Sequence, residues 1–177
     1  MSIDRIEEAR LTAEDEAGIA ALLELAFPEP PGFEGRSYYI QRHHVRFVRR
    51  DPGIVGHLAV QMRAIRLGGR IVTIGGFGDV STHPDRRGEG IASALVREGI
   101  AEVRAMRCDF AALFGVEPLY EKAGFRKVHN PMVWTDQDGV RTGEPIRGRT
   151  AEHLMVLPTG TLDWDESAEV DLVGGLF

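Results

Sequence analysis

The chain has 177 residues, of which 43% are apolar and 27% are charged, as expected for a soluble globular protein with one sizeable core. A net charge of −6 argues against nucleic acid as the main partner, and no apolar run approaches the ~20 residues that a membrane span needs. The single cysteine, Cys108, cannot form an internal disulfide, and the acidic N-terminus lacks the apolar core of a signal peptide. We therefore expect one cytoplasmic domain over residues 1–177, with no membrane partner.

The first fifty residues predict a strand, a helix and the start of a hairpin. Residues 3–10 suit a strand, and Thr12 with Asp15 three residues later approximates a capping box for a helix that must stop before Pro28. A second short helix is expected over 35–41, in a segment that either grips a substrate or simply connects. Alternating apolar residues then indicate strands on both sides of Asp51-Pro52-Gly53.

Two long strands are predicted over 54–67 and 70–82, with a tight turn at Gly68-Gly69 between them. Long antiparallel strands that lead into a glycine loop do not match a Rossmann fold, because that fold starts with a βαβ unit. The sequence therefore argues against a dinucleotide-binding domain.

The second long strand runs into a glycine-rich loop that opens a helix. Arg87, Gly88 and Gly90 lie in this loop, and the apolar period after it predicts a helix over about 88–106. Such a loop leaves backbone N–H groups unpaired at the positive end of the helix dipole, and glycine lets an anion approach closely. The loop is therefore predicted to bind a phosphate group.

The last seventy residues predict a buried strand over 109–115, a short helix from Pro118, and strands over 125–134 and 153–157. Residues 135–149 are polar and indicate a loop or a loose hairpin. The acidic residues 158–177, with Trp164 among them, either bind a polycationic substrate on the substrate side of the protein or form a solvated tail. The expected fold class is α/β (α+β), with a mixed, mostly antiparallel central sheet flanked by helices.

Two motifs resemble those of the GCN5-related N-acetyltransferase (GNAT) superfamily. Arg87-x-x-Gly90-x-Ala92 is similar to its pyrophosphate-binding motif Q/R-x-x-G-x-G/A, and LYEKAGF at 119–125 is similar to its Tyr-x-x-x-Gly-Phe segment. The element order over about 3–157 also resembles this fold. More loosely, the start EARLTAEDEAGIAALLELAF, the turn HPDRRGEG and the ending LPTGTLDWDESAEVDLVGGLF resemble the aminoglycoside 2′-N-acetyltransferases. The acidic residue that this branch carries before its C-terminal aromatic is absent here, where Gly175-Leu176-Phe177 stands.

The resemblance implies acetyl-CoA as the cofactor and a primary amine of a small, cationic, aminoglycoside-like molecule as the substrate. The strand before the loop would offer its main chain to the pantetheine arm, and the loop and first helical turn would bind the pyrophosphate. The cofactor-binding residues would then be Val80, Ser81, Thr82, Arg87, Gly88, Glu89, Gly90, Ile91, Ala92 and Ser93. Arg86 is assigned no role. Dimers are common in the family, so the resemblance also allows a homodimer.

Direct attack of an amine on the thioester, in a ternary complex, needs a base for the amine proton and an acid for the leaving thiolate. The resemblance places Tyr120 as the acid; the alternative is that it only packs under the loop. The aminoglycoside branch has a base where Gly78 aligns here, and the adjacent Asp79 can replace it only through a β-bulge. Further candidates for the base are Glu117, His83 and the C-terminal carboxylate of Phe177.

Other chemistries fit the sequence less well. Cys108 has no evident histidine partner, so it is expected to be a small core residue rather than an acyl-carrying nucleophile. No metal is expected, because the six histidines, His43-His44 included, lack zinc-ligand spacing. Two alternative functions remain. One is an N-acyltransferase that takes a longer acyl group from a carrier protein, as nodulation-type enzymes do, and the other is a non-catalytic acyl-CoA-binding protein.

Overall fold

The computed structural model describes residues 2–29, 32–116, 118–137, 143–150 and 152–177. The chain forms two compact units, one of residues 1–61 and 77–102 and one of residues 62–76 and 103–177. The long strands β3 (Ile54–Leu67) and β4 (Arg70–Thr82) have the predicted bounds, and each contributes a part to both units. The two units are described separately.

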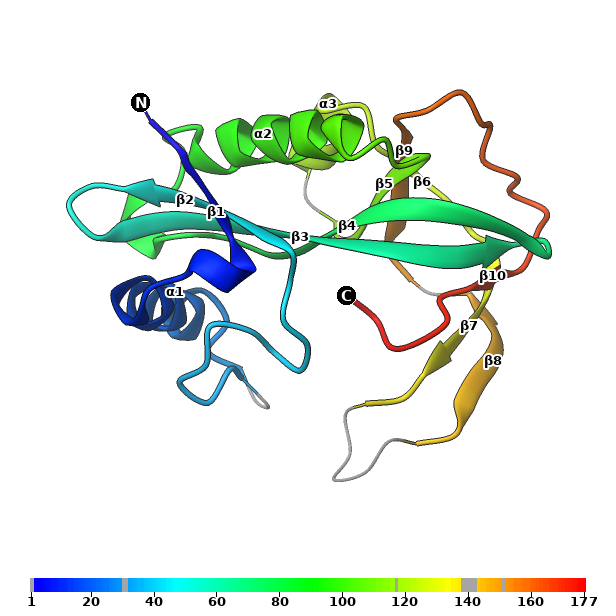
Figure 1. The fold of residues 1–177 in the computed structure, drawn as a ribbon, viewed down its shortest axis with the longest axis horizontal. Helices are drawn as coiled ribbons and strands as arrows, with labels where there is room; N and C mark the ends of the chain where they lie inside the picture. The colour runs from blue at the N-terminus through cyan, green and yellow to red at the C-terminus, as the bar shows by residue number, and fades with distance from the viewer. Residues whose placement is uncertain (1, 30–31, 117, 138–142, 151) are drawn as a thin grey trace. The chain divides into compact units, whose positions relative to one another are not determined.

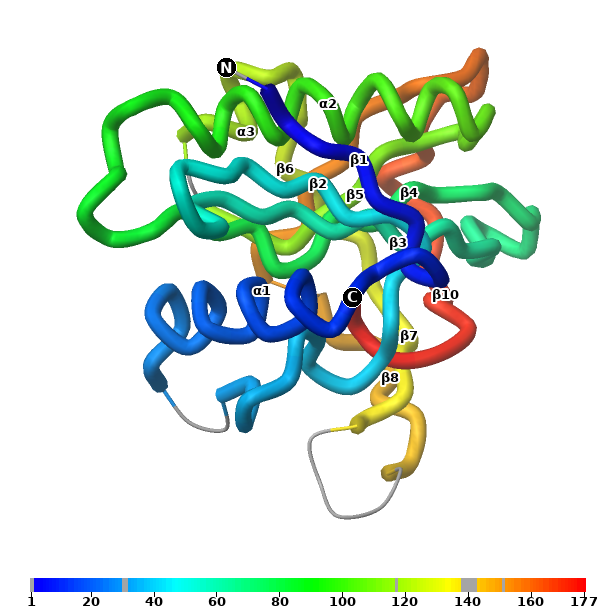
Figure 2. The backbone as a smooth tube through the Cα atoms, turned by 60° about the vertical axis from the view of Figure 1, so that its left-hand side comes forward, coloured from blue at the N-terminus to red at the C-terminus, as the bar shows by residue number. Residues whose placement is uncertain are grey.

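The first unit is a sheet with a helix on each face (Figures 1 and 2). Strand β1 (Asp4–Glu7) pairs antiparallel with β2 (Val45–Arg50), and β2 pairs antiparallel with β3. Helix α1 (Ala13–Ala26) covers one face, and the part of α2 (Ile91–Ala105) in this unit covers the other. A Cβ on Gly56 would lie 2.4 Å from Ile91 Cγ2, so this glycine lets α2 pack directly on β3.

Helix α1 begins with the predicted capping box. Thr12 Oγ1 accepts a hydrogen bond from Asp15 N at 3.1 Å, and Asp15 Oδ2 accepts one from Thr12 N at 3.0 Å. Its predicted apolar face is buried in a cluster that includes Ile19, Leu22 and Leu23. The cap and the apolar period together therefore explain where α1 starts and which face it buries.

Two predictions for the first unit are wrong. The strand expected over 3–10 ends at Glu7, because residues 8–10 form the 3₁₀ helix η1. The helix expected over 35–41 is absent: Glu34 and Gly35 have φ of +51° and +73°, and no helix follows them. Left-handed residues do not continue into a right-handed helix, so the chain crosses this region as a series of bends.

The second unit has the strand order β6-β9-β5-β4-β3-β10-β7-β8. Strand β10 pairs parallel with β7 and antiparallel with β3, and the pairs β5–β9, β6–β9 and β7–β8 are antiparallel. The elements not yet given are β5 (Phe110–Phe114), α3 (Pro118–Lys122), β6 (Arg126–Lys127), β7 (Pro131–Thr135), β8 (Pro145–Thr150), β9 (Leu154–Pro158) and β10 (Val170–Asp171). The predicted α+β class with a mixed, mostly antiparallel sheet is confirmed.

The acidic tail is part of the second unit's core. Trp164 is 5% exposed, its ring meets that of Phe110 edge-on at 5.1 Å, and its Nε1 donates to Asn130 Oδ1 at 2.8 Å. Val170 and Leu172 are also buried there. The prediction of a solvated tail is therefore wrong for this part of the chain, and the buried Trp164 is not available to a polycationic ligand.

Asn130 also explains why the strand expected over 125–134 is divided into β6 and β7. Its side-chain amide donates to the carbonyls of Asp165 and Ala168, both at 2.8 Å, so the chain bends here to hold the tail. Pro131, which has no N–H to donate to a ladder, starts β7. Of the two forms expected for 135–149, the hairpin is observed in the β7–β8 pairing.

Cys108 is a core residue, as predicted. It is 1% exposed, and burial together with the charge of Asp109 raises the pKa of its thiol. A thiol in these surroundings is a poor nucleophile, which argues against an acyl-enzyme. No helix in the part of the chain that the structure describes is long and apolar enough to cross a membrane.

Candidate active site

The glycine-rich loop has the backbone that its sequence predicts. The 3₁₀ helix η2 (Pro84–Arg86) precedes it, and Gly88 and Gly90 have φ of +83° and +79° before α2 starts at Ile91. A Cβ at either glycine would meet no protein atom within 4 Å, so backbone conformation and not crowding favours glycine here. The first turn of α2 leaves its N–H groups without carbonyl partners inside the helix, as an anion site requires.

The predicted cofactor-binding residues all belong to the first unit: the end of β4 (80–82), the loop (87–90) and the first turn of α2 (91–93). Ser81 Oγ and Thr82 Oγ1 are buried and have no hydrogen-bond partner within the described residues. Arg87 and Ser93 are exposed. Buried hydroxyl groups are normally hydrogen-bonded, so the two unsatisfied ones fit a ligand with polar groups along this strand.

Arg86 ties the loop to the turn between β2 and β3. Its guanidinium binds both carboxylate oxygens of Glu89, at 2.6 and 2.9 Å, and Asp51 Oδ2 at 3.0 Å. The hydrogen bond and charge of Arg86 lower the pKa of Glu89, so this carboxylate is ionised and held by its partner. The sequence assigned Arg86 no role, whereas in the structure it balances the only acidic residue of the loop sequence 87–90.

Asp79 has an unusual backbone within β4. Its φ is +53°, in the left-handed region, which is rare for a residue with a Cβ and is one of the conformations that a β-bulge uses. Its carboxylate oxygen Oδ2 lies 2.9 Å from His43 Nε2, and its main-chain oxygen lies 2.9 Å from His57 Nδ1. Two histidines therefore hold the residue, one at the side chain and one at the main chain.

His57 is fully buried, and its tautomer follows from its partners. Arg46 Nη1 lies 3.2 Å from His57 Nε2, and arginine can only donate, so Nε2 accepts and Nδ1–H donates to the Asp79 carbonyl. Burial, followed by the nearby charge of Arg46, lowers the pKa of His57 to about 4. The imidazole is therefore neutral at neutral pH.

Arg46 is also fully buried, and its charge is compensated. Its Nε and Nη2 donate to the carboxylate of Glu8 at 2.7 and 3.1 Å, and its Nη1 donates to the Ser37 carbonyl at 2.7 Å. Burial alone would raise the pKa of Glu8, but the hydrogen bond and charge of Arg46 outweigh it and lower that pKa. A continuous hydrogen-bonded chain thus runs from Glu8 through Arg46 and His57 to Asp79. Nothing in the sequence pattern predicted it.

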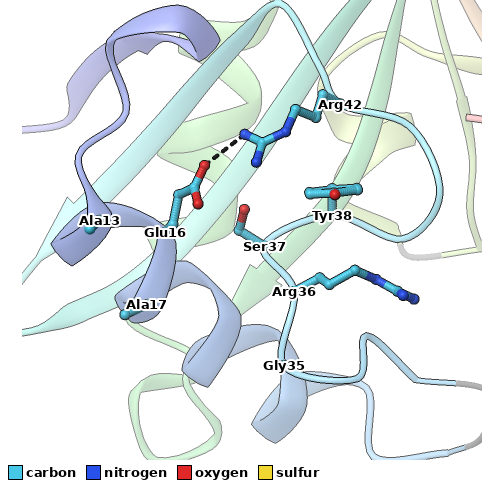
Figure 3. Close-up of a pocket in the computed structure, with 8 residues that line it drawn as sticks. All are labelled: Ala13, Glu16, Ala17, Gly35, Arg36, Ser37, Tyr38 and Arg42. Atoms are coloured by element: carbon cyan, nitrogen blue, oxygen red, sulfur yellow. Dashed lines mark hydrogen bonds and ion pairs between the residues drawn. The ribbon is translucent and has the colours of Figure 1, made fainter.

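A pocket of about 340 Å³ lies between α1 and residues 35–42, and Figure 3 shows the side chains that line it. Arg42 lies across it, with hydrogen bonds to Glu16 at 2.6 Å and Glu8 at 3.1 Å, and its guanidinium lies 4.8 Å from the centre of the Tyr38 ring. The positive charge of Arg42 is thus already paired with the carboxylates of Glu8 and Glu16, so the pocket favours no particular charged ligand.

Tyr120 belongs to the second unit, where it lies in α3 and is 7% exposed. Its ring meets Phe125 edge-on at 6.3 Å, and a Cβ on Gly115 would lie 2.7 Å from its Cε2. The phenol is thus packed in a defined orientation, and its role as an acid stays a prediction.

Of the other candidate bases, the structure describes His83 and Phe177. His83 Nδ1 accepts a hydrogen bond from Asp85 N at 3.3 Å and so caps η2. In the second unit, the ring of Phe177 packs against Phe114 at 5.2 Å. Glu117 lies outside the described residues.

Comparison with known proteins agrees with this geometry. Residues 8–128 match the family model of the acetyltransferase (GNAT) domain. The chain belongs to this family and is an acetyltransferase, as the motifs predicted. No curated protein matches the chain.

Solved structures of low sequence identity share the fold. A GNAT family acetyltransferase from Brucella melitensis in complex with acetyl-CoA is 21% identical, with a TM-score of 0.63 over 96% of this chain and 94% of that one. YhbS from Escherichia coli in complex with CoA is 18% identical, with a TM-score of 0.63 over 97% and 88%. Eis1 from Mycobacterium abscessus is 14% identical, with a TM-score of 0.62 over 75% of this chain, which spans only 33% of that longer protein.

Proposed function

We propose that this acetyltransferase transfers the acetyl group of acetyl-CoA to a primary amine of a small, cationic molecule in a ternary complex. The observation that carries the donor side is the stretch from Ser81 to Gly90. It combines two buried hydroxyls that have no partner within the described residues with a loop in which Gly88 and Gly90 have a left-handed backbone directly before α2. The structural relatives from Brucella melitensis and Escherichia coli, which hold acetyl-CoA and CoA, support the same assignment.

Each part of the stretch has a separate task in this proposal. The main chain of Val80, Ser81 and Thr82 pairs with the pantetheine arm, and the N–H groups from Arg87 to Ala92 bind the pyrophosphate, with the Ser93 hydroxyl beside them. Arg87 adds a positive charge, while Arg86 keeps Glu89 from repelling the phosphates. Charge-assisted hydrogen bonds to main-chain N–H groups suit a pyrophosphate because they need no particular side chain.

Bound acetyl-CoA supplies an activated thioester carbonyl carbon. The amine nitrogen forms a bond to this carbon, and the bond from carbon to sulfur breaks. Tyr120 is assigned to protonate the departing sulfur, since the pKa of a phenol, about 10, lies above the pKa of about 8.5 of a thiol. Asp79 is assigned to the side that accepts the amine proton.

The acceptor class rests on weaker support. The net charge of −6 favours a cation, and the start, central turn and ending of the sequence resemble aminoglycoside 2′-N-acetyltransferases. An aminoglycoside-like amine is therefore the first acceptor to test, although Gly175-Leu176-Phe177 replaces the acidic ending of that branch.

Thiol release from acetyl-CoA, measured against a panel of aminoglycosides, polyamines and simple primary amines, tests the proposal. We expect release with at least one cationic amine and none with neutral alcohols. Release with no amine, despite stabilisation of the protein by acetyl-CoA, would refute the enzyme assignment and favour a non-catalytic acyl-CoA-binding protein. Release that requires long-chain acyl donors would favour the acyl-carrier alternative.

A Gly90→Glu variant tests the loop independently of turnover. Glutamate would place bulk and negative charge against the pyrophosphate, on a backbone with φ of +79° that disfavours it. We expect calorimetry to detect no acetyl-CoA binding by this variant. An affinity equal to that of the wild type would contradict the assignment of the loop.

A further inference from the structure

His43 and Asp79 form a buried pair in the first unit. His43 Nε2 lies 2.9 Å from Asp79 Oδ2, and the two side chains are 7% and 13% exposed. The other ring nitrogen of His43, Nδ1, is buried and has no hydrogen-bond partner within the described residues. A buried polar atom without a partner is unfavourable in a folded protein, so it requires an explanation.

The tautomer of His43 follows from Asp79. Burial alone would raise the pKa of this carboxyl, but the His43 hydrogen bond and the nearby charges outweigh it and hold the pKa below its usual value. The ionised carboxylate can only accept, so neutral His43 must carry its proton on Nε2. Nδ1 then presents an unshared lone pair, which faces no donor in the part of the chain that the structure describes.

We infer that His43 is the base that takes the amine proton and that Asp79 is a positioning residue which orients it. This inference rests on the proposed function and deepens it. A carboxylate with an ordinary pKa of about 3.9 is a weak base at neutral pH, whereas an imidazole with an ordinary pKa of about 6.5 is well matched to it. The arrangement explains how Asp79 serves the base side although its Oδ2 already accepts a hydrogen bond from His43.

Charged groups from several elements lie around His43. Asp79 from β4 and Glu8 from η1 are negative. Arg46 from β2 and Arg42 are positive, and both are paired with Glu8, so two negative charges are present with two positive ones. His57 from β3 is neutral and adds no repulsion. Of these charged groups, the Asp79 carboxylate is the one that the His43 ring contacts at hydrogen-bond distance.

The amine nitrogen bonds to the carbonyl carbon and loses one proton to His43 Nδ1, and the bond from carbon to sulfur breaks. The thiolate gains one proton from the phenol of Tyr120. Solvent then carries the proton from the His43 imidazolium back to the Tyr120 phenolate. No oxidant, metal or further reactant is needed.

A His43→Gln variant separates the base from its hydrogen bond. The glutamine amide can still donate to Asp79, but it cannot accept a proton. We expect kcat with the best amine to fall by about 100-fold or more. The acid limb of the kcat–pH profile should disappear, while the Kd of acetyl-CoA should change less than twofold. The matched control is His44→Gln, the adjacent exposed histidine, which should retain the wild-type rate and pH profile.

Nitrogen-15 NMR of the imidazoles supplies a test without turnover. We expect the Nε2–H tautomer for His43, with the pattern lost in Asp79→Ala. Wild-type kcat with an unchanged acid limb in His43→Gln, or an Nδ1–H tautomer in the wild type, would overturn the role of His43 while leaving the enzyme assignment intact. If no amine of the panel causes the wild-type protein to release thiol, the proposed function is refuted, and the role of His43 with it.

Discussion

His57 Nδ1 donates to the main-chain oxygen of Asp79 over 2.9 Å, at the one point of β4 where a residue other than glycine has a left-handed backbone. A left-handed conformation at a residue with a Cβ costs about 1–2 kcal/mol, so it persists only where other contacts hold it. Arg46 fixes the tautomer that makes this donation. The buried histidine thus holds the backbone just before Val80, where the segment assigned to the pantetheine arm begins.

The stability of the protein should depend on pH through His57. The folded pKa is about 4, whereas an unfolded histidine titrates near 6.5, so the unfolded state binds more protons between these values. The free energy of unfolding should therefore fall as pH is lowered from about 6.5 to about 4, by up to about 3 kcal/mol from this group. Urea unfolding at several pH values measures it.

The control for this prediction is His57→Asn. Asparagine can place an N–H donor near the position of Nδ1 but does not titrate, so the variant should lose this part of the pH dependence. An equal slope between pH 4 and 6.5 in the variant and the wild type would show that other groups cause it. Carboxylates such as Glu8 and Asp79 contribute mainly below their usual pKa, because their folded pKa values are lowered.

Gly88→Ala should weaken acetyl-CoA binding beyond its effect on stability. Gly88 and Gly69 share a φ of +83°, and a Cβ at either would meet no protein atom within 4 Å. Both alanine variants should therefore lose about 1 kcal/mol of stability through backbone strain. Only Gly88→Ala should also weaken acetyl-CoA binding. Its Kd should rise by about tenfold, which corresponds to a loss of about 1.4 kcal/mol of binding free energy. Equal affinities in the two variants would argue against the loop as the pyrophosphate site.

Arg86→Ala should weaken acetyl-CoA binding without touching the proposed ligand. The variant frees the Glu89 carboxylate, which Arg86 holds at 2.6 and 2.9 Å, next to the main chain assigned to the pyrophosphate. The loss should be several-fold in affinity and should shrink as salt is added, because exposed charges are screened. Titration calorimetry at two salt concentrations measures both effects.

The double variant Arg86→Ala with Glu89→Gln tests the cause. Removing the negative charge should restore most of the affinity, because repulsion rather than a lost contact is responsible. If the double variant binds as weakly as Arg86→Ala alone, Arg86 acts through its hydrogen bond to Asp51 and the loop position instead.

The sequence predicted those features that depend on local rules. Capping by Thr12, the bounds of β3 and β4, and glycine at positions 88 and 90 all follow from short-range patterns, and the structure has them. The prediction of a helix over 35–41 is wrong because Glu34 has a left-handed backbone. Glutamate has no preference for that conformation, so the sequence does not indicate it. Apolar and polar patterning alone cannot reveal such a residue.

The contacts of the two histidines with Asp79 could not be predicted from such local rules. His43 and His57 lie 36 and 22 residues from Asp79 in the sequence, and only strand pairing and the backbone at Asp79 bring them together. A shift of one residue in register would turn Asp79 to the other face. The sequence therefore offered His43-His44 only as possible metal ligands, and nothing distinguished Arg46, which is buried, from the two other arginines of the strand VRFVRR.

Tyr120→Phe should separate acid catalysis from packing. Tyr120 is 7% exposed and its ring contacts Phe125, so phenylalanine keeps the packing and removes only the hydroxyl. If the phenol protonates the leaving sulfur, kcat should fall by about 100-fold while the Kd of acetyl-CoA stays within twofold. Stopped-flow thiol release and calorimetry measure the two quantities.

Tyr39→Phe is the matched control and should keep the wild-type kcat. Because a thiol with a lower pKa needs less protonation, an acetyl donor with a better leaving group should rescue Tyr120→Phe more than the wild type, and equal responses would contradict the acid role.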